Sequence, residues 1–300
     1  SALHLAALAT QGGAGHVLAV GVEKMWTGDR AETLAGIEDG VPIVDREFMH
    51  AHWENPSGSV LMALNATWAL EHMAAWGTTA EQVAAAAVKA RRHGALNPHA
   101  QFQSEVTLEE VLASPAIVPP LTRLMCSSFT DGGAAVVLSP EARPGSPRIR
   151  STTARSGNGA IDYHDRLAQT AAAAWEASGV DPADVDVVEL HDATAAEEIC
   201  ALESLCFYAP GAAAAATAAG DTALGGRGVT VNTSGGLVAR GHPLGATGIA
   251  QVVELVAQLR DEAGPRQVEG ARLAVAANTD RKSTRLNSSH VSESRMPSSA

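Results

Sequence analysis

His242 lies in a glycine-rich loop that leads into an amphipathic helix. It stands between Gly241 and Pro243, and the residues Gly245-Ala246-Thr247 follow two positions later. Apolar residues then recur on one helical face, at Ile249, Val252, Val253, Val256 and Leu259. The backbone N–H groups at a helix N-terminus favour negative charge, so an imidazole placed there can donate to a developing oxyanion. We therefore predict that His242 is catalytic.

A second histidine, His191, directly follows a predicted buried strand at Asp186–Leu190. Ligands of α/β sheets gather outside the carboxyl ends of the strands, so His191 is well placed for a site. Taken alone, a histidine at a strand end is more often a structural residue bonded to the backbone. Its pairing with the His242 loop makes a functional role the stronger interpretation.

These two segments together resemble the thiolase superfamily. The similarity is closest to the branch that holds the sterol-carrier-protein thiolases and the bacterial lipid-transfer or steroid-degradation thiolase-like proteins. The His191-Asp192-Ala193-Thr194 segment resembles the HDCF-type loop of the sterol-carrier thiolases. The GHP loop of the superfamily is matched by Asn232, Ser234-Gly235-Gly236, Gly241-His242-Pro243 and Gly245-Ala246-Thr247-Gly248.

The resemblance implies a fold and a set of site residues. The fold would be α/β, with two duplicated βαβαβαββ halves forming five layers, αβαβα, and truncated at both ends. His191 and His242 would be the catalytic residues of one oxyanion hole, where two neutral imidazoles polarise the thioester oxygen. Coenzyme A thioester would be the substrate, with no further cofactor and no metal. The residues expected to bind the substrate are Ala193, Gly241, Ser234 and Gly235.

The sequence departs from the family pattern in three places. The nucleophilic cysteine of the family would stand just upstream of Ser1, outside this chain. The cysteine of the HDCF motif, which serves as acid and base there, is Ala193 here. The glycine loop that closes the family site should begin near Asn278, where the sequence changes character. Cys126-Ser127-Ser128 looks like a nucleophile motif, but in the family this position precedes a closing strand, so we interpret Cys126 as structural.

The resemblance leaves three functions open. The first is an acyl-CoA acyltransferase of the thiolase type, which cleaves or forms 3-oxoacyl-CoA in lipid or sterol side-chain metabolism. The second is a thiolase-like aldolase or lyase that acts on a steroid-type acyl-CoA together with a small OB-fold partner protein. The third is a catalytically silent carrier of lipids or CoA esters. Ala193 favours the second, and a homodimer is expected from the family.

The elements that must position the two histidines fall into three regions. Residues 1–147 form a partial N-terminal half that includes a loop domain at about 25–110, and residues 148–280 form the C-terminal half. Residues 281–300 lose all periodicity, and we predict a disordered or artefactual tail. Strands are predicted near 16–22, 134–138, 148–153, 186–190, 229–231 and 271–277, and helices near 57–76, 79–93, 107–113, 165–178 and 195–205. A further helix is predicted to open at Gly245-Ala246-Thr247 and to end at Gly264-Pro265.

Composition limits the remaining choices. The chain has 300 residues, of which 46% are hydrophobic, so two domains with a large core are possible. A net charge of −12 argues against a nucleic-acid partner. No apolar run is long enough to span a membrane, no signal peptide is visible, and the three cysteines fit a cytoplasmic protein. The other histidines, at 50, 52, 72, 93 and 99, lack metal-ligand spacing and are assigned to packing or the surface.

Overall fold

The structure is a computed structural model of the whole chain. It describes residues 2–29, 32–33, 35–36, 47, 50–51, 60–155, 163–279 and 287–293.

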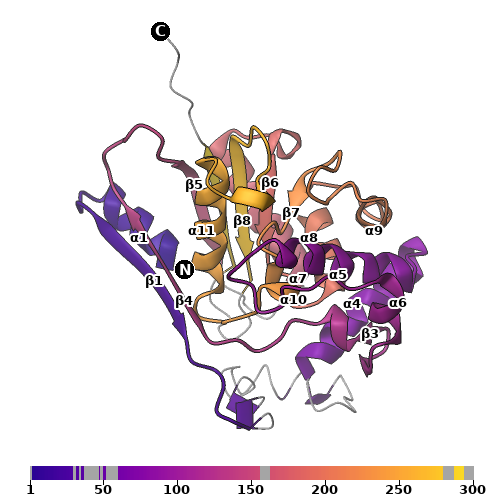
Figure 1. Cartoon of the computed structure of the whole chain (residues 1–300). Coiled ribbons are helices and arrows are strands. Elements are labelled where there is room, and N and C mark those ends of the chain that lie inside the picture. The colour runs from indigo at the N-terminus through magenta and orange to yellow at the C-terminus, as the bar shows by residue number, and fades with distance from the viewer. Residues whose placement is uncertain are drawn as a thin grey trace.

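Two sheets form the framework of the molecule (Figure 1). The first is an antiparallel pair of β1 (Val17–Glu23) and β4 (Gly132–Leu138). The second has five strands in the order β5-β9-β8-β6-β7, with β6 parallel to both β7 and β8. Its strands are β5 (Arg148–Arg155), β9 (Asn287–Glu293), β8 (Leu273–Asn278), β6 (Val187–Leu190) and β7 (Thr230–Val231).

Two helices lie between the sheets. α1 (Ala2–Gln11) contacts β1, β4 and β5, and α11 (Thr247–Leu259) contacts both sheets. Apolar residues of these helices and of the strands share one buried cluster, which includes Leu3, Ala19, Leu255 and Ala274. α7 (Tyr163–Ser178) and α8 (Ala195–Ser204) cover the other face of the larger sheet. The described residues therefore show four layers in the order β, α, β, α.

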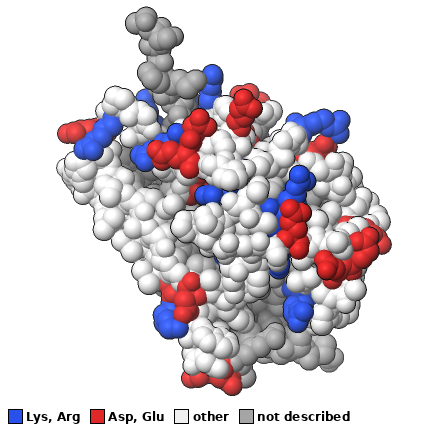
Figure 2. Space-filling view, in the orientation of Figure 1, with Lys and Arg blue, Asp and Glu red and all other residues white. Residues whose placement is uncertain are grey.

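The outward face of the two-stranded sheet is apolar and exposed. Period-2 alternation turns Ala19 inward, whereas Leu18, Val20 and Val22 face outward with exposures of 61%, 48% and 68%. Figure 2 shows few charged side chains over this flank of the molecule. This is the face that the outer helical layer of a five-layer fold would cover. Among the described residues, no helix combines the length and apolar character that crossing a membrane requires.

Helices from the predicted loop domain pack against α8. α4 (Val60–Trp76) and α5 (Ala80–Ala95) confirm the helices predicted near 57–76 and 79–93. Thr79 caps α5 and Thr107 caps α6 (Leu108–Ala113), each in a reciprocal capping box with a residue three positions on. The remaining short elements are β2 (Ala116–Val118), β3 (Leu121–Thr122), α9 (Ala213–Ala218), α10 (Gly236–Ala239) and the 3₁₀ turns η1 (Arg123–Met125), η2 (Pro182–Asp184) and η3 (Gly264–Arg266).

Strand β9 differs from the predicted tail. The sequence predicted a disordered or artefactual tail at residues 281–300, but Asn287–Glu293 form a strand between β5 and β8. A strand ladder is made by backbone N–H and C=O groups, so a polar segment without hydrophobic periodicity can occupy a position between two other strands. The rest of that tail, residues 281–286 and 294–300, lies outside the described residues.

Candidate functional site

β6 carries His191 to the edge of the larger sheet. All four residues of this strand are buried, and the His191 N–H donates to the Ala277 carbonyl of β8 at 2.9 Å. The side chain amide oxygen of Asn232 accepts the Leu190 N–H at 2.8 Å, which ties the strand end to the loop after β7. The His191 side chain is therefore fixed on a rigid element at the carboxyl end of a parallel strand, as the sequence predicted.

Glu197 orients the His191 ring. Nδ1 of His191 lies 3.0 Å from Oε1 of Glu197, in the first turn of α8. The other carboxylate oxygen, Oε2, accepts the Ala193 N–H at 3.1 Å. The Tyr163 hydroxyl donates to Oε1, and Glu197 is fully buried. The sequence analysis did not single out Glu197. The signal that could have found it is an acidic residue in the first turn of the helix that follows His191.

The His242 loop is held by the smaller sheet. Gly21 of β1 lies so close to the loop that a Cβ on it would come within 2.8 Å of the Ala246 Cα and overlap the Gly245 carbonyl oxygen. Glu23 Oε2 accepts the Gly245 N–H at 2.9 Å. The His242 N–H donates to the Ser128 carbonyl at 3.2 Å. The first half of the chain thus positions His242, a predicted catalytic residue that belongs to the second half.

The two predicted catalytic histidines meet. Their ring centroids are 5.1 Å apart and their planes are at 81°. Nδ1 of His242 lies 2.9 Å from Oγ1 of Thr247, at the start of α11. Because Nδ1 and Nε2 lie on different edges of an imidazole ring, the bonds made by Nδ1 turn each Nε2 away from its orienting partner. The structure therefore brings two imidazole rings, each held through Nδ1, side by side at the candidate site.

The four predicted binding residues divide into two pairs. Ala193 is half-buried beside His191, and Gly241 precedes His242 with φ +105°, a conformation that favours glycine. Ser234 and Gly235 are buried in the interior instead. The Ser234 hydroxyl donates to Glu189 Oε2 at 2.6 Å, and a Cβ on Gly235 would come within 2.8 Å of the Gly94 Cα. The structure gives these two residues a packing role beneath the loop.

Comparisons with known proteins agree with this geometry. Residues 158–285 match the family described as thiolase C-terminal domain-like. The acetyl-CoA acetyltransferase of Methanothermobacter thermautotrophicus is 40% identical over 278 residues, which cover 87% of this chain and 68% of that protein. The chain belongs to the thiolase family.

Two further relatives place the chain within the family. Sterol carrier protein 2 of Bos taurus is 37% identical, and the match covers 93% of this chain and 54% of that protein. The chain therefore spans about half the length of this relative. The solved structure of the Ltp2-ChsH2(DUF35) aldolase superposes with a TM-score of 0.79 at 25% identity, covering 97% of this chain and 76% of that one.

A layer of buried charge supports the thiolase-family loops from below. Glu189 of β6 lies 3.9 Å from the Arg240 guanidinium, and Lys89 of α5 lies 2.5 Å from Glu198. Burial raises the pKa of Glu189 to about 7 and also raises the pKa of Glu198. Burial raises the pKa of Asp192 well above its usual range, and the nearby Glu198 raises it further. This layer ties the His191 strand, α8 and the His242 loop into one unit.

Two cysteines of the chain, Cys126 and Cys200, are not in activating surroundings. The Cys126 Sγ donates to the Thr122 carbonyl at 3.4 Å, and burial raises the pKa of its thiol to about 12. Burial raises the pKa of Cys200 to about 12 as well. A thiol with such a pKa is protonated at neutral pH and is a poor nucleophile. These contacts fit the structural role predicted for Cys126.

Three of the remaining histidines have structural or surface settings. His93 is buried, with Nδ1 on the Asn232 carbonyl and Nε2 accepting the Leu224 N–H, each at 3.0 Å. Burial lowers the pKa of His93 to about 4. His72 bonds Thr78 and Glu203, and His99 is exposed. His52 lies outside the described residues.

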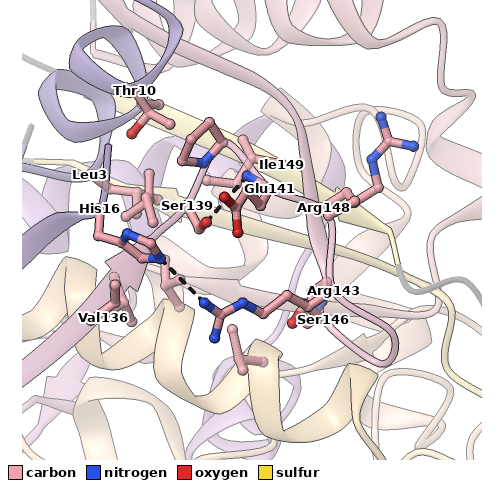
Figure 3. A pocket seen from close by; sticks show the side chains of 18 of the residues that line it. Leu3, Thr10, His16, Val136, Ser139, Glu141, Arg143, Ser146, Arg148 and Ile149 are labelled. Carbon is pink, nitrogen blue, oxygen red and sulfur yellow. Dashed lines mark hydrogen bonds between the residues drawn. The ribbon is translucent and has the colours of Figure 1, made fainter. Parts of the chain in front are cut away.

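A cavity of about 670 Å³ lies away from His191 and His242. α1, β4, α11 and the connection between β4 and β5 line it, and His16 there bonds Arg143 at 3.3 Å (Figure 3). Neither His191 nor His242 lines this cavity. The paired histidines, and not the cavity, therefore define the candidate site.

Proposed function

We propose that this protein is an acyl-CoA acyltransferase of the thiolase type, which cleaves or forms 3-oxoacyl-CoA. The observation that carries the proposal is the pair of His191 and His242, with ring centroids 5.1 Å apart on two separate loops. The family relationship to an acetyl-CoA acetyltransferase at 40% identity supports it.

The chemistry follows from the charge that develops on the thioester oxygen. When a C–C bond next to a thioester forms or breaks, negative charge accumulates on that oxygen. A preorganised donor from His242 stabilises this charge, and losing one such donor typically costs about 3–4 kcal/mol. The nucleophilic cysteine that the family resemblance places before Ser1 remains a prediction, and Cys126 does not replace it.

The test is thiolysis of a short 3-oxoacyl-CoA. The protein is incubated with acetoacetyl-CoA and free CoA, and acetyl-CoA is measured by liquid chromatography. We expect acetyl-CoA formation that depends on free CoA and that His242→Gln reduces strongly. His99→Gln, at an exposed position, is the matched control. Absence of acetyl-CoA with a folded protein that carries the cysteine predicted before Ser1 would reject thiolysis.

A second candidate is retro-aldol cleavage of a branched 3-hydroxyacyl-CoA. Ala193 stands where the resembling HDCF motif has its cysteine, and the Ltp2-ChsH2(DUF35) aldolase shares the fold with a TM-score of 0.79. Under this proposal the substrate would be a steroid-type acyl-CoA, and a small OB-fold protein would be the partner. Retro-aldol cleavage releases a ketone or aldehyde and does not consume free CoA, so omission of CoA separates the two activities.

The same assays also test the third candidate function, a carrier of CoA esters. Binding of acyl-CoA without turnover of either substrate class, with or without the partner, would indicate a carrier.

We propose a homodimer in the cytoplasm, in line with the family resemblance and with three free cysteines. Sedimentation of the purified protein measures the first, and fractionation of the source cells measures the second.

A further inference from the structure

We propose that Glu197 and His191 form a carboxylate–imidazole pair that carries the proton of the reaction, while His242 alone donates to the thioester oxygen. The proposal rests on the proposed acyl-CoA chemistry and assigns different tasks to the two histidines. His191 is the base, and Glu197 is a positioning residue that acts through it.

The partner of His191 decides which ring nitrogen holds the proton. An ionised carboxylate can only accept hydrogen bonds. Glu197 receives the Ala193 N–H at 3.1 Å and the Tyr163 hydroxyl, and it lies in the positive first turn of α8. These donors stabilise the carboxylate, so Nδ1 of His191 must carry the proton of the 3.0 Å bond. In the neutral ring, Nε2 then has a lone pair and can accept a proton.

The partner of His242 permits the opposite tautomer. A threonine hydroxyl can donate or accept. The Pro243 carbonyl already accepts the Thr247 N–H at 2.8 Å and the Ala246 N–H at 2.8 Å. The Thr247 hydroxyl also lies 3.0 Å from that carbonyl oxygen and could donate to it. Because two N–H groups already occupy the two lone pairs of the carbonyl, we assign the hydroxyl hydrogen to Nδ1 of His242 at 2.9 Å. Nε2 of the neutral His242 ring then carries the hydrogen that an oxyanion requires.

Among the residues that the structure describes, Glu197 is the charged group that bonds the His191 ring directly. His242 faces it from the loop before α11, and Tyr163 of α7 reaches it through Glu197. Asp192, the next residue in the chain, turns its Oδ1 to the Leu237 N–H at 2.7 Å. Its burial favours the neutral acid. From β6, Glu189 is engaged by Ser234 and Arg240.

The proposed step balances with these two histidines. His191 Nε2 takes a proton from the α-carbon of the acyl group, so a C–H bond breaks and an N–H bond forms. The electron pair moves into the enolate, whose oxygen accepts the hydrogen bond from His242. Glu197 stabilises the imidazolium that results. In the reverse direction the same N–H bond returns the proton to carbon. This assigns a base to a site in which Ala193 replaces the expected cysteine.

The first test reads the tautomers without any turnover. The full chain is labelled with ¹⁵N-histidine, and the side chain nitrogens are assigned with His191→Gln and His242→Gln. At a pH where both rings are neutral, we expect His191 to be protonated on Nδ1 and His242 on Nε2. A neutral His191 protonated on Nε2 would overturn the proposal, because that nitrogen could not then act as a base.

The second test follows proton removal directly. Acetyl-CoA is incubated with the protein in D₂O, and deuterium at the α-carbon is measured by mass spectrometry. General-base catalysis is typically worth about 10²–10⁴-fold, so we expect Glu197→Gln to slow exchange by roughly 10²-fold. The acid limb of the pH–rate profile of exchange should also move to lower pH in this variant, because the uncharged amide no longer stabilises the imidazolium. Thr247→Val, the matched change at the other histidine, should slow exchange without moving that limb.

The outcomes separate this proposal from the proposed function. Exchange in the wild-type protein with an unmoved acid limb in Glu197→Gln would overturn the pair and leave acyl-CoA chemistry intact. If a folded wild-type protein shows neither exchange nor acetyl-CoA formation, the proposed function is rejected. The tautomers would still test the pair. A Glu197→Gln variant that fails to fold is replaced by the Glu197→Asp variant, whose shorter carboxylate should weaken exchange but keep the acid limb near its wild-type position.

Discussion

The two histidines of the site are the same residue type in two different settings. His191 is 8% exposed and directly follows a buried parallel strand, and a carboxylate orients its ring. His242 lies in a glycine-rich loop, and a hydroxyl orients its ring. A carboxylate imposes a proton on Nδ1, whereas a hydroxyl can donate or accept. The difference teaches that the orienting partner, and not the histidine itself, determines which task each ring can perform.

The two settings also differ in what supports them. The direct partners of His191 come from the C-terminal half, from β8 and α8, although Ser127 and Asn65 of the first half bond the next residues, Ala193 and Thr194. His242 depends on both halves, because Gly21 and Glu23 of β1 hold its loop. Changes in β1 should therefore disturb His242 and spare His191, and the following predictions test that contrast.

The largest effect is expected from removing the rings themselves. We expect His191→Gln to lower kcat by roughly 10³-fold, because it removes the base, and His242→Gln to lower it by about 10²–10³-fold. Rates are measured by acetyl-CoA formation, and far-ultraviolet circular dichroism checks the fold. A loss smaller than tenfold in either variant would contradict the role assigned to that histidine.

A methyl group on β1 should disturb only the His242 setting. In Gly21→Ala the new Cβ would lie within 2.8 Å of the Ala246 Cα, so the loop must shift. A small displacement of a positioned group can cost about 10²-fold, and we expect roughly 10–10²-fold here. The ¹⁵N signals of His191 should stay at their wild-type positions. Gly15→Ala, where the structure leaves open space for a Cβ, is the control and should be neutral.

Acid should destabilise the fold through a third histidine, His93. Its pKa is about 4 in the folded protein, against about 6.5 when unfolded, so the unfolded chain binds the proton first as pH falls. The contribution of neutral His93 to the free energy of unfolding is complete above pH 6.5 and is lost toward pH 4, by about 3 kcal/mol in total. Denaturant unfolding at several pH values measures the slope, which His93→Gln should flatten. This separates acid unfolding from the acid limb assigned to His191.

The smallest effect is expected at Thr247. Thr247→Val keeps the shape but removes the hydroxyl that orients His242. One hydrogen bond is worth about 1 kcal/mol, so we expect roughly a fivefold loss of kcat. Thr247→Ser retains a hydroxyl and should lose less. Equal losses in the two variants would show that packing, rather than the hydroxyl, supports the ring.

Most helices and strands could be predicted from local sequence. Hydrophobic periodicity placed α5, α7 and α11 within a few residues. β9 could not be predicted, because its polar residues carry no strand pattern and the neighbouring strands supply its hydrogen bonds. The pattern of a segment indicates its local preference, whereas a position between two other strands is set by the tertiary structure.

The sequence by itself determined the family and the two histidines. Spacing within the loops at 191–194 and 232–248 was enough, because short segments carry those motifs. Only the tertiary structure decided how the histidines differ. Glu197, Thr247 and Gly21 reach the site through helix geometry and long-range packing. The proton positions that distinguish a base from an oxyanion donor are therefore set by contacts between elements, which no local spacing specifies.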